Sequence, residues 1–199
     1  QAFLAVLRDA LFGGAGASDL VLPRVDLSRL FPEPAVDYVR RKGGEVRFGS
    51  MVRELAALRS EFDRVIVAVG PHQLKALLPA SAPSYAYQPI YTCYLQYEEA
   101  TRLPFPMLGL ADGLVQWVFD RGALTGEHAR LACVISAQGE HQQLEHDAIA
   151  QRCDAELAHA LPGLAQPRWT RVIAEKRATI SCTPGAKSLR LATGEVTLA

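Results

Sequence analysis

The sequence lacks an excess of charge of either sign. Its 199 residues carry 21 Lys plus Arg and 21 Asp plus Glu, so the formal net charge is zero. A neutral chain has no long-range attraction for polyanions, and we therefore expect no nucleic-acid partner. Long apolar runs are also missing, since none approaches the roughly 20 residues that span a bilayer. No signal-peptide pattern precedes the amphipathic start at Gln1, and the missing initiator Met suggests a chain cut from a longer one.

The spacings that hold metal ions or build nucleophiles are missing as well. The chain contains no Cys-x-x-Cys pair, no histidine pair with metal-ligand spacing and no Gly-x-Ser-x-Gly elbow. We therefore predict neither a metal site nor a hydrolase nucleophile. The four cysteines are read as reduced core thiols of a cytosolic protein. They are Cys93, Cys133, Cys153 and Cys182.

A glycine-rich segment at residues 13–18 does not supply a dinucleotide-binding loop. Such a loop follows a strand and opens a helix, so that the pyrophosphate meets free N–H groups. Here the glycines follow a helical pattern over residues 2–12 and precede the apolar residues 20–22. We interpret the segment as the end of a helix.

Hydrophobic periodicity predicts helices and strands in mixed order. Helices are predicted at 2–12, 33–42 (with Ser28 as a candidate cap), 72–78 and 141–161. Strands are predicted at 45–48, 51–55, 65–69, 90–97, 114–119, 131–136 and 168–181. The β-branched run 65–69 is typical of a strand buried on both faces. The order indicates an α+β fold, in which a partial α/β layer accompanies a mixed, mainly antiparallel sheet backed by helices.

Aromatic residues gather in two of the predicted strands. They are Tyr91, Tyr94, Tyr97, Trp117 and Phe119. Such residues either wall an apolar cavity or fill a core, and the sequence leaves both readings open. Asp120 and Arg121 follow directly; they either line a pocket or form an ion pair within a turn, and the ion pair is favoured.

Five strings occur together along the chain. They are LPRVDLSRLFP at 22–32, PMLGL at 106–110, QWVFDRG at 116–122, VISA at 134–137 and EKRAT at 175–179. In this order they resemble the squalene-associated FAD-dependent desaturases, also described as hydroxysqualene dehydroxylases. That group belongs to the flavin amine oxidase and phytoene desaturase superfamily. The resemblance covers almost the whole chain.

The resemblance implies two domains built from interleaved segments. Residues 1–83 would form a helical segment and part of an FAD-binding domain, 84–170 the substrate domain, and 171–199 a return segment. The backbone at Val52 would meet the adenine, and the segment of Ala68, Val69, Gly70 and Pro71 would run beside the FAD. Tyr94, Trp117 and Phe119 would wall the substrate pocket. No catalytic residue is identified.

The chain departs from that family at both ends. The Gly-x-Gly-x-x-Gly fingerprint and the closing Gly-Asp segment are missing, so we expect a substrate-side fragment that binds FAD weakly or not at all. The whole enzyme would transfer a hydride at an allylic carbon of a squalene-like substrate. We expect a cytoplasmic protein with an apolar small-molecule partner. Two points stay open: peripheral contact with the inner membrane, and a homodimer formed through surface that truncation of the chain would expose. The alternatives are a flavin amine oxidase and a non-catalytic binding module.

Overall fold

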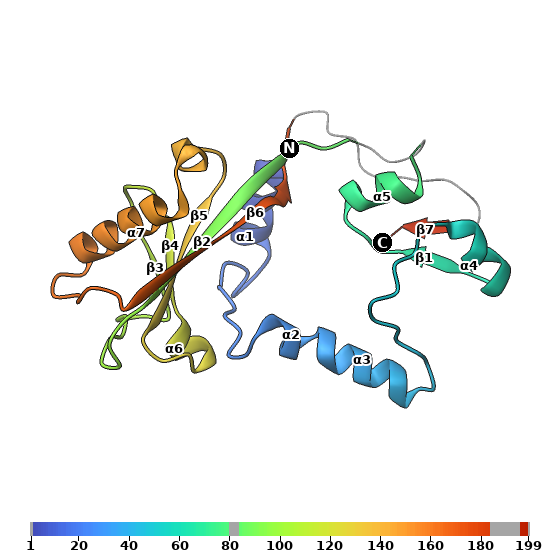
Figure 1. Ribbon diagram of the computed structural model, residues 1–199, viewed down its shortest axis with the longest axis horizontal. Helices are drawn as coiled ribbons and strands as arrows, with labels where there is room; N and C mark the ends of the chain where they lie inside the picture. The colour runs from blue at the N-terminus through green and yellow to red at the C-terminus, as the bar shows by residue number, and fades with distance from the viewer. Residues whose placement is uncertain (1, 80–83, 184–195, 199) are drawn as a thin grey trace. The chain divides into compact units, whose positions relative to one another are not determined.

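The computed structural model describes residues 2–79, 84–183 and 196–198, and the chain forms two compact units (Figure 1). The first unit comprises residues 1–44 and 88–179, and the second comprises 45–87 and 180–199. The α+β fold class with a mainly antiparallel sheet is confirmed. The domain boundaries at 83/84 and 170/171 stay predictions.

The first unit is built on a five-stranded sheet with strand order β3-β4-β5-β2-β6. The strands are β2 (Tyr87–Gln96), β3 (Met107–Gly109), β4 (Trp117–Asp120), β5 (Arg130–Ser136) and β6 (Trp169–Ile180). The pairs β2–β5, β3–β4 and β4–β5 are antiparallel. The strands predicted at 90–97, 131–136 and 168–181 are confirmed, whereas the strand predicted at 114–119 begins only at Trp117 and β3 was not predicted.

One face of this sheet holds the main core. Alternate residues of β2 point to it, and helix α7 (His146–Ala160) covers it (Figure 1). Leu95, Leu131 and Leu157 are fully excluded from solvent. Full burial of a side chain of this size contributes about 1.5–3 kcal/mol, so the contact between α7 and the sheet is the main source of stability in this unit.

The helix predicted at 141–161 is divided in two. A 3-10 turn, η1, covers Glu140–Gln143, and α7 begins at His146. Leu144 and Glu145 between them have extended backbone, with ψ near 147° and 152°. Leu144 nevertheless packs against the core, which explains why its apolar spacing looked continuous with α7.

The N-terminal segment of the first unit carries three helices. They are α1 (Ala2–Phe12), α2 (Leu27–Leu30) and α3 (Pro32–Arg41). The helix predicted at 2–12 and its end at the glycines are confirmed: a Cβ on Gly13 would lie 2.3 Å from the carbonyl oxygen of Asp9. The second predicted helix is also confirmed, but Ser28 lies inside α2, and Phe31 precedes α3.

The second unit pairs β1 (Val65–Val67) in parallel with β7 (Val196–Leu198) and carries α4 (Leu55–Glu61) and α5 (Pro71–Leu77). Its core is Leu55, Val67 and Leu74. The predictions of strands at 45–48 and 51–55 are wrong, because residues 45–54 form no strand and Leu55 begins a helix. Burial of β1 on both faces is also wrong, since Ile66 is 67% exposed.

Three of the four cysteines are buried, as predicted, and Cys182 is exposed, which corrects its assignment to the core. The sequence also predicts a turn at residues 183–185, of which residues 184 and 185 lie outside the described residues. Within those residues, no helix combines the length and apolar character that crossing a membrane requires.

Candidate functional site

The second face of the five-stranded sheet borders an open pocket of about 800 Å³. All of its lining belongs to the first unit. The sheet forms one wall through Thr92, Tyr94, Phe119, Ala132 and Val134. The opposite wall is the segment from Leu22 to Glu33, and Arg121, Leu124 and Thr125 of helix α6 (Arg121–Thr125) close one side.

Strand register explains the shape of the sheet wall. Ala132 of β5 is paired with Tyr94 of β2 on one side and with Phe119 of β4 on the other. Side chains that are directly paired lie on the same face of a sheet. A methyl group between two aromatic rings leaves a hollow, so Ala132 makes room for a ligand between Tyr94 and Phe119.

Trp117, the third residue that the family resemblance assigns to the substrate pocket, lies two positions before Phe119 on β4. Trp117 pairs with Val134 and Gly109 and lies on the same sheet face as Phe119, but it is not part of the pocket lining. Its ring covers Gly109, where an added Cβ would lie 3.1 Å from Cζ3. The structure thus brings Tyr94 and Phe119 together and leaves Trp117 beside them, 41% exposed. A role for these three residues in binding stays a prediction.

Arg121 is the charged residue on the α6 side of the pocket. Its Nε donates to Glu127 Oε2 at 2.6 Å, and its Nη2 donates to Asp26 Oδ1 at 3.0 Å. Arg121 therefore lines the pocket and also pairs, but its partners are not the adjacent Asp120. Burial acts to lower the pKa of Arg121, yet the hydrogen bonds to Glu127 and Asp26 outweigh it, and the pKa is raised above its ordinary value.

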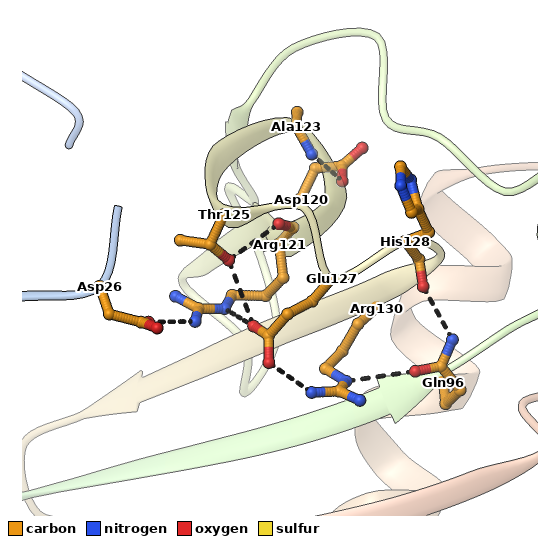
Figure 2. A network of polar contacts seen from close by, with 9 residues as sticks. All are labelled: Asp26, Gln96, Asp120, Arg121, Ala123, Thr125, Glu127, His128 and Arg130. Carbon is orange, nitrogen blue, oxygen red and sulfur yellow. Dashed lines mark hydrogen bonds and ion pairs between the residues drawn. The ribbon is translucent and has the colours of Figure 1, made fainter. Parts of the chain in front are cut away.

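Glu127 links Arg121 to a second arginine outside the pocket lining. Glu127 Oε1 accepts from Arg130 Nη1 at 2.5 Å, and Arg130 Nε donates to Gln96 Oε1 at 3.2 Å (Figure 2). The guanidinium of Arg130 also lies 5.2 Å from the centre of the Trp169 ring. These contacts hold Glu127 in place, and Glu127 in turn orients Arg121.

Asp120 fixes the start of α6 and with it the position of Arg121. Its side chain is only 1% exposed and accepts from the backbone N–H groups of Ala123 at 2.9 Å and Leu103 at 3.0 Å. The first of these contacts is an N-cap, which satisfies a donor that the helix leaves unpaired. The turn ion pair predicted for Asp120 and Arg121 is thus corrected: Asp120 is a helix cap.

The residues predicted to meet the FAD lie in the second unit. Val52 belongs to the irregular stretch before α4 and is 42% exposed. Ala68, Val69, Gly70 and Pro71 connect β1 to α5, and Ala68 and Val69 are exposed. Their assignment to the cofactor stays a prediction.

The junction between β1 and α5 does not fit the pyrophosphate of FAD. The N–H of Gly70 already donates to Gln73 Oε1 at 3.0 Å, and Pro71 has no N–H. Residues 13–18 follow helix α1, so they do not lie between a strand and a helix. Across the ranges that the structure describes, no glycine loop joins a strand to a helix in the manner of a dinucleotide cradle. No chemical step is therefore assigned to a flavin held by these residues.

Sequence reasoning missed most of the second pocket wall. Asp26, Arg29 and Glu33 line the pocket. The sequence analysis named Asp26 and Arg29 only as members of the string at 22–32, and it did not name Glu33. The strand residues could have been found from alternation, because Thr92 and Tyr94 fall between the buried residues of β2. Nothing local to residues 22–33 indicates which strand they meet.

The comparisons with known proteins agree on a family. Residues 32–189 match the family model of the flavin containing amine oxidoreductases. Hydroxysqualene dehydroxylases of Sinorhizobium fredii, Rhodopseudomonas palustris and Zymomonas mobilis are 27%, 26% and 28% identical to the chain. These alignments cover 94%, 94% and 90% of the chain, and 46%, 47% and 45% of the relatives.

The chain thus spans about half the length of the curated relatives it matches. Among solved structures, a candidate protoporphyrinogen oxidase of Exiguobacterium sp. 255-15 matches with a TM-score of 0.49 and 12% identity. That match covers 62% of this chain and 31% of the other. The family assignment rests on the sequence matches.

Proposed function

This chain belongs to the flavin containing amine oxidoreductase family, and we propose that its pocket binds the substrate of an FAD-dependent oxidoreductase acting on hydroxysqualene or a similar isoprenoid alcohol. Three relatives that align along at least 90% of the chain are named for this substrate. The single observation that carries the proposal is the hollow between Tyr94 and Phe119 over Ala132.

The size and the surface of the pocket suit a long hydrocarbon chain. Its volume of about 800 Å³ lies within the range of roughly 300–1,000 Å³ found for small-molecule sites. Its sheet wall offers two aromatic rings, Ala132 and Val134, and the opposite wall adds Leu22 and Leu27. Apolar walls of this kind bind through the area they remove from water and so favour a flexible isoprenoid over a polar metabolite.

The chain's own part in the reaction is binding and orientation. In this family a bound flavin supplies hydride transfer, whereas the protein positions the substrate and keeps water away. Transfer at an allylic carbon stays part of the proposal, because the described residues do not form a complete FAD site. The rings of Tyr94 and Phe119 on either side of Ala132 would limit the directions in which the hydrocarbon substrate can lie.

A binding measurement tests the pocket directly. Hydroxysqualene, added in detergent micelles, would be titrated against the protein while tryptophan fluorescence is recorded, since Trp117 lies beside the pocket. We expect Phe119→Ala to raise the Kd about tenfold, because the loss of a buried aromatic contact costs on the order of 1.4 kcal/mol. Phe105→Ala is the matched control, since Phe105 is 64% exposed and lies outside the pocket lining. Equal Kd values for the wild type and both variants would refute the proposed pocket.

A flavin amine oxidase acting on an amine is the second candidate, because carboxylates line the pocket. Asp26 is already paired with Arg121, and Arg29 accompanies Glu33, so the lining carries no excess of negative charge for an ammonium group. The alcohol is therefore favoured. A turnover screen of the full-length protein, using hydroxysqualene and a panel of alkylamines, separates the two; binding of hydroxysqualene without turnover in that protein would favour a non-catalytic module.

A further inference from the structure

We propose that Arg121 is the residue that recognises the oxygen of the substrate, by donating a hydrogen bond from Nη1 to the hydroxyl group of an otherwise apolar chain. This inference deepens the function proposed above and rests on it. It assigns the hydroxyl-bearing part of the substrate to the side of the pocket formed by α6.

The first step of the argument is that Arg121 is held in place with one edge left over. Two carboxylates on different segments engage Nε and Nη2, at 2.6 Å for Glu127 and 3.0 Å for Asp26. Among the described residues, none accepts a hydrogen bond from the third nitrogen, Nη1. A guanidinium that is fixed at two nitrogens keeps its remaining donors in a defined direction, because the group is planar and rigid.

The second step concerns the surroundings of Arg121. Its side chain is only 24% exposed and lines the pocket together with Tyr94, Phe119 and Leu124. The side chain that carries this donor therefore lines a pocket whose sheet wall is largely apolar. A ligand that removes water from the donor must also satisfy it.

The third step decides which kind of oxygen suits this site. Arg121 and Arg130 face Asp26 and Glu127, so the four-residue cluster is formally neutral (Figure 2). An anionic group, such as a carboxylate or a diphosphate, would find no net positive charge and would compete with Asp26 for Nη2. A neutral alcohol needs only one donor and brings no charge, and it is the ligand class that the geometry favours.

The expected consequence is selectivity for the alcohol over the parent hydrocarbon. A site built to hydrogen-bond an oxygen rejects the analogue that lacks it, because a desolvated donor is then left unpaired. Since the pocket is open and Arg121 keeps some contact with water, we expect a preference on the order of tenfold and not the much larger factors of fully enclosed sites.

The test compares hydroxysqualene with squalene in the wild-type chain and in three variants, by tryptophan fluorescence titration in the same micelles. We expect Arg121→Gln to lose the roughly tenfold preference, through weaker binding of hydroxysqualene and unchanged binding of squalene. Arg121→Lys keeps a charge and a donor and should retain part of the preference. Arg168→Gln is the matched control: it removes an arginine that is also paired with a carboxylate, that of Glu98, but does not line the pocket or contact Glu127.

Each outcome bears on one proposal only. A preference that survives in Arg121→Gln, or one that Arg168→Gln abolishes equally, would overturn the role of Arg121. Equal binding of both ligands by the wild type would also overturn it and leave the substrate pocket standing. Failure of the wild type to bind either ligand would instead refute the proposed function.

If Arg121→Gln does not give the circular dichroism spectrum of the wild type, Arg121→Lys decides, and an undiminished preference for hydroxysqualene in that variant counts against the inference. Farnesyl diphosphate serves as the anionic probe, and tighter binding of it than of hydroxysqualene would contradict recognition of a neutral alcohol.

Discussion

Glu156 lies against Gly113 so closely that a Cβ placed on the glycine would be 2.7 Å from Glu156 Oε2. The same carboxylate accepts the backbone N–H groups of Leu114, at 2.9 Å and 3.0 Å from its two oxygens, and of Val115, at 2.8 Å from Oε2. Helix α7 is thereby attached to the turn that leads into β4. The contact requires residue 113 to have no side chain.

Gly113→Ala should lower the free energy of unfolding by about 2–4 kcal/mol. The backbone has φ of +105°, which strains a residue with a Cβ, and the new methyl group would displace Glu156 from its charged hydrogen bonds. Gly126→Ala is the control, because Gly126 also has positive φ but nothing lies within 4 Å of an added Cβ, so only about 1–2 kcal/mol is expected. Urea unfolding measures both. Equal losses in the two variants would show that the contact with Glu156 is unimportant.

Asp120→Ala should destabilise the protein by about 2–4 kcal/mol. The change removes a helix cap and also leaves the N–H of Leu103 without its acceptor in a buried position. Asp112→Ala provides the comparison, since Asp112 is exposed and its loss should change stability by less than about 0.5 kcal/mol. Thermal melting followed by circular dichroism measures the difference. A melting temperature for Asp120→Ala that matches that of Asp112→Ala would contradict the role of Asp120 as a cap.

His141 should make stability depend on pH. It is only 3% exposed, its Nε2 has no hydrogen-bond partner among the described residues, and its ring packs edge-on against Tyr91 with 4.9 Å between centres. Burial, and then the charge of Arg152, lower the pKa of His141 below 6.5. Arg152 and Glu140 are the charged residues that line a small hollow of about 230 Å³ with it.

The sign follows from proton binding. Because the folded pKa lies below that of the unfolded chain, the unfolded chain binds more protons between the two values, and the free energy of unfolding rises with pH in that window. Stability is therefore lost as the pH falls from about 6.5 towards the folded pKa, and this loss is complete below it. His141→Phe keeps a ring against Tyr91 and should lose less stability between pH 7.5 and pH 5 than the wild type. An identical pH dependence in both proteins, measured by urea unfolding, would argue against this role of His141.

The cysteines should differ sharply in reactivity. Cys93, Cys133 and Cys153 are fully buried, and Cys93 is directly paired with Cys133 across β2 and β5. A hydrogen bond to Cys153 and burial raise the pKa of the Cys93 thiol, and hydrogen bonding to Cys133 together with burial raises that of Cys153. Thiols with a raised pKa react slowly, because the thiolate is the nucleophile.

Alkylation with iodoacetamide at pH 8 should therefore modify one cysteine, Cys182, in the native protein and four in denaturant. Peptide mass spectrometry identifies the modified positions. Modification of a buried cysteine at a rate similar to that of Cys182 would contradict the packing of α7 on the sheet.

The sheet of the first unit was predictable because its strands alternate buried and half-buried residues over several positions. Residues 90–97 show this pattern clearly, residues 131–136 show it only from Cys133 onward because Ala132 is buried as well, and both strands were found. Short apolar stretches were not decidable in the same way. Residues 51–55 looked like a strand. Leu55 and Leu58, however, lie three positions apart on one side of α4, and both pack into the core of the second unit.

The pocket was predictable only on its aromatic side. Tyr94 and Phe119 stand out by residue type, and strand pairing then places them on either side of Ala132. The partner of Arg121 was missed because the nearest carboxylate along the chain, Asp120, is taken up by backbone donors. Asp26, which does pair with Arg121, could be found only from the tertiary structure.

The Asp26–Arg121 contact joins residues that are 95 positions apart in the sequence. Closing a chain segment of this length costs about 4 kcal/mol in conformational entropy, whereas a partly exposed ion pair contributes about 0–1 kcal/mol. The pair therefore does not bring these segments together by itself. We expect β2, β4 and β5 to assemble first during folding, and the segment around Asp26 to dock afterwards onto a surface that already exists.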